Sequence, residues 1–550
     1  MCGIFASYGE ATCQCECQPL PADVNHALEQ LKARGPEGTH HIRPAPHVNL
    51  GFTRLAINGL SDCGMQPFIS LQGRLHVVCN GEIYNHVELS AKYDIPNTSG
   101  SDCEVLGPLF HKLKNPVVWA QALDGVFAIA LYDKATDRIY VARDPYGVRP
   151  LYYGYYYSET SSETPKKTIV FASEIKALTP YCENIEPFPP GYVGYYHENT
   201  LRIRRFHRVP TQKNLSLVDN PTAAMATLKT ALESAVQKRL MTERPVAALL
   251  SGGVDSSLIA ALVQKNLKAL GKPPLETFSI GFAGSPDLHY ARLVADHIGS
   301  KHHEIIATPD DFFQAIPEVI HSIESFDITT VRASVGNWLV AKAIRTQTDC
   351  KVVFNGDGAD EVFGSYLYFY NAPSDEAFED DCTRLLETIH HFDVLRSDRC
   401  ISSHGLEPRT PFLDKNFVAV ARSIPTVWRR PVMGVRPEKG ILRKAFEDDG
   451  LLPTEVLWRR KEAFSDGVSQ QTKSWYQEAQ ERIQGLISMP PIGFLADRFP
   501  DMTPQTLEAY YYRVIYTNFY GEETVTQPYF WLPRWCGDAT DPSARTLAIY

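Results

Sequence analysis

The chain has 550 residues, which at roughly 150 residues per domain predicts more than one folded domain. Hydrophobic residues make up 44% and charged residues 21% of the sequence, which is typical of a globular protein and excludes a disordered or fibrous one. The formal net charge of −10 excludes a bulk positive field that would attract nucleic acid or an anionic membrane surface. No run of about 18 apolar residues occurs, so we expect no membrane-spanning helix.

The N-terminus does not have the features of a secretory signal, because it lacks a basic segment and reaches an acidic residue at Glu10. The chain has 12 cysteines, a much lower density than in disulfide-stabilised secreted domains. We therefore expect a cytosolic protein with mostly free thiols. Three cysteines, in Cys13-Gln-Cys-Glu-Cys17, form no Cys-x-x-Cys pair, so an inserted loop explains them better than a metal site.

The N-terminal part of the chain has the pattern of a mostly β structure. Short runs of β-branched and aromatic residues, bounded by Gly, Asp and Pro, predict strands. The predicted strands cover residues 50–57, 75–79, 126–132, 138–142, 152–157 and 168–172.

After a polar stretch at residues 211–220, the pattern changes to alternating helices and strands. We predict helices over 221–240 and 256–270, strands over 246–250 and 275–282, and mostly helices beyond Asp375. Alternation of this kind is typical of a parallel sheet covered by helices. We expect one domain over residues 1–205, a linker over 206–220 and a second domain over 221–550.

Cys2 directly follows the initiator methionine. Removal of Met1 would leave one residue with both a thiol and a free α-amine. An α-amine with a pKa of about 7.7–8.0 is able to accept the thiol proton at neutral pH, as in N-terminal nucleophile hydrolases. Taken alone, a cysteine here is more often only a small residue after the start codon, so the function depends on other residues.

Several residues of the same half suit the binding of a free amino acid. Asn80 and Gly81 follow a predicted strand and offer a side-chain amide and a backbone N–H to an oxyanion. Arg54, which we expect at a strand centre, offers a guanidinium to an α-carboxylate, and Glu82 and Asp102 offer anions to an α-ammonium. Each of them singly is more often a turn residue or a surface ion pair.

In order and spacing, these motifs resemble the glutamine amidotransferase domain of the N-terminal-nucleophile type. The resemblance rests on Cys2-Gly-Ile, Arg34-Gly-Pro, Arg54-Leu, Asn80-Gly-Glu-Ile-Tyr-Asn and Ser99-Gly-Ser-Asp102. It implies an αββα sandwich in which Cys2 attacks the glutamine amide and a glutamyl thioester is hydrolysed to release ammonia. It implies glutamine-binding roles for Arg54, Ile57, Asn80, Gly81, Glu82 and Asp102. The chain departs from the family at Ala33 and Glu37, where relatives often carry His and Asp.

A Ser-Gly-Gly-Val-Asp-Ser-Ser loop at residues 251–257 lies between a predicted strand and a predicted helix. Its glycine N–H groups, its serine hydroxyls and the helix N-terminus together predict an anion cradle. The chain has no Gly-x-x-x-x-Gly-Lys-[Ser/Thr] motif, which excludes a Walker-type loop. The heptad resembles the pyrophosphate loop of ATP pyrophosphatases, which split ATP into AMP and pyrophosphate.

A second, acidic loop over residues 355–361 also follows a strand-like run. We predict that Asp255 and Asp360 are Mg²⁺ ligands, because hard oxygens and triphosphate are what Mg²⁺ prefers. Lys461 lies in a basic cluster and is predicted to neutralise charge on the α-phosphate or on the tetrahedral adduct.

Over essentially the whole chain, the motif order resembles the glutamine-hydrolysing asparagine synthetases. Further matching segments are Phe278-Ser-Ile-Gly281, Gly284-Ser-Pro-Asp-Leu288, Phe326-Asp-Ile-Thr-Thr-Val-Arg-Ala-Ser334, Glu407-Pro-Arg-Thr-Pro-Phe-Leu-Asp414 and Asp541-Pro-Ser-Ala-Arg545. The resemblance implies a doubly wound α/β domain of the ATP-pyrophosphatase type. There aspartate attacks the α-phosphate of Mg-ATP to give β-aspartyl-AMP and pyrophosphate, and ammonia displaces AMP to form asparagine. It also implies a mostly uncharged passage for ammonia between two sites, and a homodimer.

The same resemblance implies residues for each substrate of the second site. The nucleotide contacts it implies are Leu250, Ser251, Gly252, Gly253, Asp255, Ser256, Ser257, Ile280, Asn355 and Gly356. The contacts it implies to aspartate, pyrophosphate or the intermediate are Thr329, Thr330, Arg332 and Asp357. Relatives sometimes carry Glu in place of Asp357, and many carry Ser in place of Asn355.

Three alternatives remain open from the sequence. A relative that forms a β-lactam would keep both half-reactions with another acyl donor or acceptor. A regulator that binds nucleotide or amino acid would have lost catalysis, which the intact Cys2, Asp255 and Lys461 argue against. An RNA-modifying ATP pyrophosphatase would share the serine-glycine loop, but a net charge of −10 argues against a nucleic-acid partner.

Overall fold

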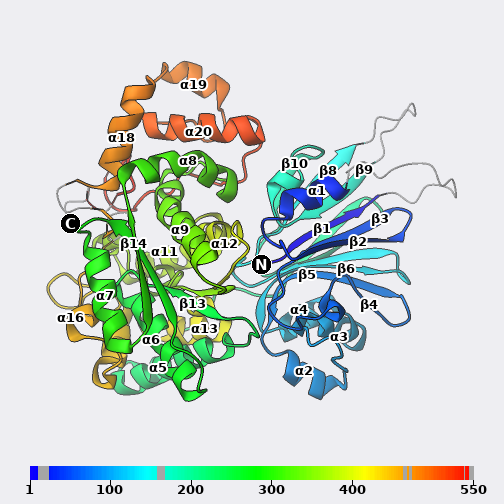
Figure 1. The fold of residues 1–550 in the computed structure, drawn as a ribbon, viewed down its shortest axis with the longest axis horizontal. Coiled ribbons are helices and arrows are strands. Elements are labelled where there is room, and N and C mark those ends of the chain that lie inside the picture. The colour runs from blue at the N-terminus through cyan, green and yellow to red at the C-terminus, as the bar shows by residue number, and fades with distance from the viewer. Residues whose placement is uncertain are drawn as a thin grey trace.

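The computed structural model describes residues 1–9, 24–157, 167–462, 467–469, 473–537, 539–543 and 545. These residues form two lobes that lie side by side, with the N-terminus of the chain between them (Figure 1). The cysteines at positions 13, 15 and 17 lie outside the described residues. No helix of the described chain is long and apolar enough to cross a membrane.

The N-terminal lobe contains two six-stranded antiparallel sheets. The first has the order β10-β8-β9-β1-β3-β2, with β10 (Glu183–Pro187), β8 (Tyr152–Tyr157), β9 (Lys167–Ala172), β1 (Gly3–Tyr8), β3 (Val48–Arg54) and β2 (Gly38–Ala45). The second has the order β12-β11-β7-β6-β5-β4, with β12 (Thr200–Arg205), β11 (Tyr192–His197), β7 (Arg138–Arg143), β6 (Gly125–Asp133), β5 (Leu75–Ile83) and β4 (Phe68–Ser70). All six predicted strands are confirmed; β1, β2, β4, β10, β11 and β12 were not predicted.

Side chains alternate between the two faces of each sheet, so one face packs against the other sheet and the opposite face packs against helices. Ile4 and Ala6 of β1 pack in one apolar cluster with Val78 of β5 and Ala128 of β6, so the sheets meet through these faces. The opposite faces carry helices: α1 (Val24–Leu31) contacts β1, and α3 (Leu106–Leu113) contacts β5. Two further helices of this lobe are α2 (His86–Tyr93) and α4 (Pro116–Ala122).

The C-terminal lobe is built on a five-stranded sheet whose strand pairs are all parallel. Its order is β15-β14-β13-β16-β17, with β15 (Lys301–Ala307), β14 (Glu276–Phe282), β13 (Val246–Leu249), β16 (Val352–Phe354) and β17 (Glu407–Arg409). Neighbouring residues of β13 face two different cores. Ala248 packs in the cluster that contains α5 (Pro221–Lys238) and α6 (Val254–Ala269), and Ala247 in the cluster that contains α8 (Pro309–Ile323) and α9 (Ile328–Gln347). The predicted parallel sheet with helices on both faces is therefore confirmed.

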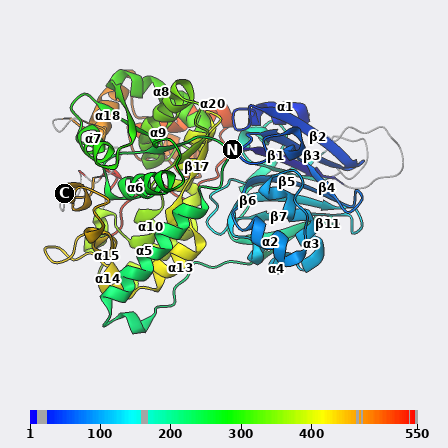
Figure 2. The same cartoon turned by 60° about the horizontal axis from the view of Figure 1, so that its bottom comes forward.

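The rest of this lobe is mostly helical, as predicted. Its helices are α7 (Pro286–Ile298), α10 (Ala359–Phe363), α11 (Asp375–Thr388), α12 (Asp393–Ser402), α13 (Lys415–Ser423), α14 (Thr426–Arg429), α15 (Gly440–Ala445), α16 (Thr454–Leu457), α18 (Trp475–Leu486), α19 (Ile492–Arg498) and α20 (Leu507–Tyr520). In the turned view of Figure 2, α5 and α13 run side by side along one edge of the lobe, and α13 contacts α5.

A buried ion-pair network joins the lobes. The Arg34 guanidinium lies 2.6 Å from the Glu174 carboxylate and 2.8 Å from that of Asp398 on α12. Arg399 of the same helix lies 2.8 Å from Glu174. Because these charges are buried but paired, removing one partner of such a set typically costs about 3–5 kcal/mol. The network therefore fixes the lobes against each other.

Candidate functional sites in the two lobes

Cys2 precedes β1 at the junction of the lobes. Its Sγ lies 3.5 Å from the Leu55 nitrogen and 3.6 Å from the Leu55 oxygen, and Arg34 Nε donates to its carbonyl at 3.0 Å. Burial raises the pKa of the Cys2 thiol to about 11 and lowers the pKa of the Met1 amine to about 6. The thiol is therefore protonated at neutral pH while Met1 is present. Removal of Met1 places an α-amine on Cys2 itself.

Asn80 and Gly81 lie within β5 and do not follow a strand end as predicted, because the pairing of β5 with β6 continues to Ile83. The Asn80 side chain is fully buried, and neither its Oδ1 nor its Nδ2 has a hydrogen-bond partner in the described chain. Such an amide is costly unless something else satisfies it. A Cβ on Gly81 would lie 2.1 Å from the Val126 oxygen, so only glycine fits the ladder here.

Arg54 is the last residue of β3 and does not lie at the strand centre as predicted. Its guanidinium is buried and donates to the backbone oxygens of Gly59 and Ser61, the latter at 2.9 Å. Ile57, also buried, lies in the loop between these contacts. The guanidinium therefore closes the loop that follows β3.

Two buried carboxyl groups lie in the same region. Burial and the nearby charge of Asp102 raise the pKa of Glu82 well above its usual range. Asn58 Nδ2 donates to Glu82 Oε2 at 2.8 Å, and the Ile83 nitrogen donates to Asp102 Oδ2 at 2.6 Å. A positively charged group between these carboxyl groups would favour their ionised forms, which is what an α-ammonium requires.

The C-terminal lobe has a cavity of about 230 Å³ at the carboxyl ends of β13, β14 and β16. This is the edge where open parallel sheets bind ligands. The predicted residues that line it are Leu250, Ser251, Gly253, Asp255, Ser256, Ile280, Thr329, Asn355, Gly356, Asp357, Asp360 and Lys461. Gly252, Ser257, Thr330 and Arg332 are not among the described residues that line it.

The serine-glycine loop has the geometry of an anion cradle. Gly253 is the N-cap of α6, and the hydroxyls of Ser251 and Ser256 lie 3.0 Å apart across the turn. The acidic loop lies directly on it, because a Cβ on Gly356 would lie 2.8 Å from the Ser256 nitrogen. The two loops therefore form one wall of the cavity at a helix N-terminus.

Lys439, which was not predicted from the sequence, lies between the two predicted metal ligands. Its Nζ is 2.5 Å from Asp255 Oδ2 and 2.6 Å from Asp360 Oδ1, and Lys461 Nζ contacts the other oxygen of Asp360. Burial alone would raise the pKa of Asp360, but the two lysines hold it below its usual range. Lys439 has no local signal in the sequence, since it lies 184 residues from Asp255.

The position of Lys439 tests whether these residues suit Mg²⁺. Two carboxylates already share one cationic group, so Asp255 and Asp360 both face a point where positive charge is stabilised. The described residues contain no group of three or more His, Cys, Asp or Glu side chains suited to a metal. Mg²⁺ commonly uses one or two carboxylates and completes its shell with phosphate oxygens and water. The pair fits a metal that arrives with a polyphosphate.

A second charged cluster lines the same cavity. Arg396 of α12 lies 2.9 Å from Asp357 Oδ1 and 3.0 Å from Asp393 Oδ1. The other oxygen of Asp357 is buried and has no hydrogen-bond partner in the part of the chain that the structure describes. Arg396 and Asp393 were not predicted from the sequence, although both line the cavity. They offer a cation and an anion to a small zwitterion.

The structure does not bring all of the Thr-Thr-Val-Arg motif to the cavity. Thr329 lines it and donates to the Trp531 oxygen at 3.3 Å. Thr330 is instead buried against Asp327, the N-cap of α9. The Arg332 guanidinium lies between Glu508 and Asp541, at 2.5 Å and 2.8 Å. Successive helical residues point about 100° apart, so a binding motif on one helix turn is divided between faces.

The family of the chain follows from comparison with known proteins. A sequence model of the glutamine amidotransferase domain matches residues 1–200, and one of asparagine synthase matches residues 227–381 and 371–535. The asparagine synthetase [glutamine-hydrolyzing] of Bos taurus is 40% identical over 578 aligned residues, which cover 100% of this chain and 99% of the relative. Those of Homo sapiens and Gallus gallus are 39% identical with the same coverage. The chain belongs to the glutamine-hydrolysing asparagine synthetase family. The resemblance predicted from the sequence is thereby confirmed over the full chain.

Proposed function

We propose that this chain converts aspartate into asparagine with ATP, using ammonia that it releases from glutamine. The observation that carries the proposal is the presence of two complementary sites on one chain. A half-buried thiol and an unsatisfied buried amide lie in one lobe, and an anion cradle with paired carboxylates lies in the other. Since ammonium is a poor nucleophile, ammonia has to pass between the lobes unprotonated, which requires a mostly uncharged route.

At the first site, Cys2 is the nucleophile once Met1 is removed. The α-amine of Cys2 accepts the thiol proton, and the thiolate attacks the carbonyl carbon of the glutamine side-chain amide. The C–N bond then breaks, the α-amine returns the proton to the leaving ammonia, and water hydrolyses the resulting glutamyl thioester to glutamate and the free thiol. The Asn80 amide and the Gly81 N–H stabilise the oxyanion of the tetrahedral intermediate. The buried, unpartnered Asn80 side chain supports this role.

The other residues of the first site hold the glutamine backbone. Arg54 binds the α-carboxylate, the loop residue Ile57 contacts the substrate, and Glu82 and Asp102 bind the α-ammonium. The raised pKa of Glu82 supports the last role, because an incoming ammonium offsets the cost of two neighbouring buried carboxylates.

At the second site, the cradle of Ser251, Gly252, Gly253, Ser256 and Ser257 holds the pyrophosphate part of ATP. The adenosine part contacts Leu250, Ile280, Asn355 and Gly356. Asp255 and Asp360 would hold Mg²⁺, which when bound supplies charge neutralisation to the phosphates. Lys461 neutralises charge at the α-phosphate as the aspartate carboxylate attacks, and Lys439 adds a second cation.

For aspartate, we propose binding at the second charged cluster of the cavity. Arg396 binds the α-carboxylate, and Asp357 and Asp393 bind the α-ammonium. Thr329 lies beside them as a hydrogen-bonding group. Arg332 and Thr330 do not contact aspartate in this proposal and instead fix the position of α9. The Arg332 side chain is held by Glu508 and Asp541, and the Thr330 side chain is held by Asp327.

The product balance tests this function. With glutamine, aspartate, ATP and Mg²⁺, asparagine, AMP and pyrophosphate are expected in equal amounts, together with glutamate. Removal of Mg²⁺ by EDTA is expected to lower asparagine formation at least about a hundredfold, since the triphosphate charge is no longer neutralised. Glutamate release is expected to continue. Glutamate without asparagine in the presence of Mg²⁺ would contradict aspartate as the acyl donor.

A residue that remains in front of Cys2 is expected to abolish glutamine hydrolysis at the first site and to leave the second site active. In a form with one additional uncleaved residue before Cys2, the α-amine is displaced and the buried thiol keeps a pKa far above neutrality, as with Met1 in place. Glutamate release should then fall at least about a hundredfold, while asparagine formation from ammonium is unchanged. Mass spectrometry of the N-terminus together with both assays checks this. Full glutaminase activity with the additional residue present would contradict the role of the α-amine.

Several finer features complete the proposal. We assign residues 1–205 to a glutaminase domain with the αββα arrangement of N-terminal nucleophile hydrolases, 206–220 to a linker and 221–550 to a synthetase domain. The end of β12 at Arg205 and the start of α5 at Pro221 support these bounds. We further propose a homodimer in the cytosol, which gel filtration with light scattering and cell fractionation test.

A further inference from the structure

Residues 55–59 form a loop that contacts the proposed glutamine-binding residues. Leu55 contacts Cys2 Sγ, Asn58 donates to Glu82, and the Gly59 oxygen accepts from Arg54. Gly59 has a left-handed backbone with φ +61°, and a Cβ there would lie 2.5 Å from the Ser99 oxygen. The loop is thus closely fitted to the site on one side.

The other side of this loop is held by the C-terminal lobe. Arg244 Nε donates to the Ala56 oxygen at 2.8 Å, and the Glu243 nitrogen donates to the Ile57 oxygen at 3.1 Å. The Gly59 nitrogen in turn donates to Glu243 Oε1 at 2.6 Å. Two consecutive residues of one lobe therefore satisfy three backbone groups of a loop in the other lobe.

The Glu37 side chain, which precedes this loop in the chain, completes the contact. Its carboxylate accepts from the Ala56 nitrogen at 2.8 Å and lies 3.1 Å from the Arg244 guanidinium. Both side chains are about a quarter exposed, so the ion pair itself contributes little. The ion pair instead orients the Arg244 guanidinium towards the Ala56 oxygen.

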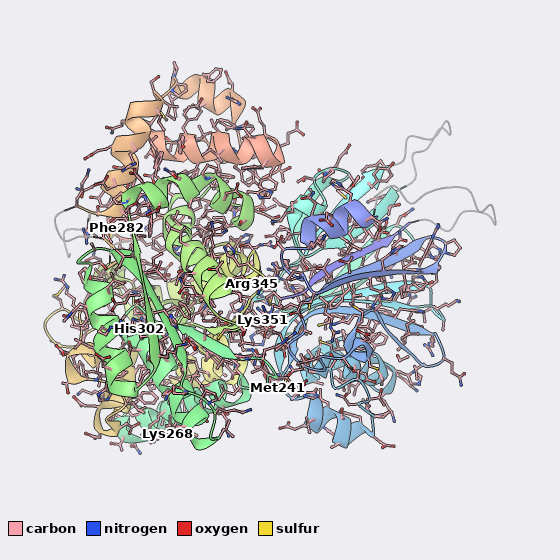
Figure 3. The ribbon with its side chains drawn as sticks, in the orientation of Figure 1. Met241, Lys268, Phe282, His302, Arg345 and Lys351 are labelled. Atoms are coloured by element: carbon pink, nitrogen blue, oxygen red, sulfur yellow. The ribbon has the colours of Figure 1, made fainter. Side chains whose placement is uncertain are left out.

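The residues that hold the loop lead directly to the ATP cavity. Pro245 follows Arg244, and its oxygen accepts from the nitrogens of Lys351 and Val352. Val246 then begins β13, which ends at the serine-glycine loop, and Val352 begins β16, which ends at the acidic loop. Met241 and Lys351 lie at the junction of the lobes in Figure 3. The strands that carry the two loops of this cavity wall thus begin at this junction.

We propose that Glu243 and Arg244, although they belong to the synthetase part of the chain, are positioning residues for the glutamine-binding loop. They hold the backbone of residues 56–59 in the form that accepts glutamine. The inference rests on the proposed placement of glutamine beside Arg54 and Glu82. Loss of these contacts weakens glutamine use and leaves the ATP cavity intact, since neither side chain lines it.

The test compares paired variants in two assays of the full-length protein. Glu243→Ala removes the acceptor for the Gly59 N–H, whereas Glu243→Gln keeps an acceptor oxygen. Arg244→Met removes the donors to Ala56 and Glu37, and Arg204→Met, at an exposed position on β12, is the matched control. The KM for glutamine and the kcat for synthesis from ammonium are measured for each variant.

The KM for glutamine is expected to rise about fivefold to tenfold in Glu243→Ala and Arg244→Met, because a backbone group of the loop loses its hydrogen-bond partner. It should stay within about twofold of the parent in Glu243→Gln and Arg204→Met, and so should the ammonium-dependent kcat of all four variants. An unchanged KM in Glu243→Ala and Arg244→Met would overturn the inference. An equal loss with both nitrogen donors would also overturn it, by showing a general structural role. Failure of the parent itself to form asparagine from ammonium would instead contradict the proposed function.

Discussion

Replacement of Cys2 by alanine is expected to lower asparagine formation from glutamine at least about a thousandfold, because no glutamyl thioester forms without the thiol. Synthesis from ammonium is expected to stay within about twofold of the parent. The reason is spatial: Cys2 lies at the start of β1, and the ATP cavity lies at the far lobe's β13, β14 and β16. The measurement is asparagine formed from each nitrogen donor, with Mg-ATP and aspartate saturating.

Cys182→Ala is the matched control for this variant, since Cys182 is a half-buried free cysteine of the same lobe. It should retain both activities. Glutamine-dependent synthesis that survives in Cys2→Ala would show that another group is the nucleophile. Loss of ammonium-dependent synthesis in the same variant would show that the two sites are not separable.

Lys461→Met is expected to abolish asparagine synthesis and to leave glutamine hydrolysis intact, which is the reverse of the effect of Cys2→Ala. Asparagine formation should fall about a thousandfold with either nitrogen donor, because the cation that neutralises charge at the α-phosphate is removed. Asp360 also loses one of the two lysines that lower its pKa. Glutamate release from glutamine should continue, since Cys2 and Asn80 lie in the other lobe. The readouts are pyrophosphate release, asparagine from ammonium, and glutamate from glutamine.

Lys268→Met is the matched control here, because Lys268 is an exposed lysine in the last turn of α6, at the edge of the lobe in Figure 3. It should behave like the parent. Equilibrium dialysis with ATP separates binding from chemistry in Lys461→Met. Near-normal synthesis in Lys461→Met would assign the charge neutralisation to Lys439 alone, contrary to the proposal.

The fold class of each lobe was predictable from local sequence, whereas six of the twelve described strands of the N-terminal lobe were not. All six predicted strands of the N-terminal lobe occur, and so does the alternation of helices and strands from Pro221 to Phe282. These elements are determined by periodicity and by turn residues that lie next to each other in the chain. The ends of elements were less predictable: Asn80 and Gly81 proved to lie inside β5, because pairing with β6 extends the strand.

Only some of the charged residues that line the sites were predictable from the sequence. Asp255 and Asp360 line the ATP cavity, as expected from loops that follow strands of one parallel sheet. Lys439 and Arg396 were not found from the sequence, and Arg332 was expected at the cavity but is held by Glu508 and Asp541. A charged side chain reaches whichever partner the packing places within a few ångströms, and pairing is favoured strongly once both groups are buried.

The sequence by itself therefore determined the family, the fold class of each lobe and the two loops of the ATP cavity. It did so because these features depend on residues that are neighbours in the chain. Only the tertiary structure decided which lysine lies between Asp255 and Asp360, which face of α9 meets the cavity, and that Arg244 holds the loop beside Cys2. Those contacts join residues that are far apart in the chain or depend on the rotation of a helix, and side-chain packing alone fixes both.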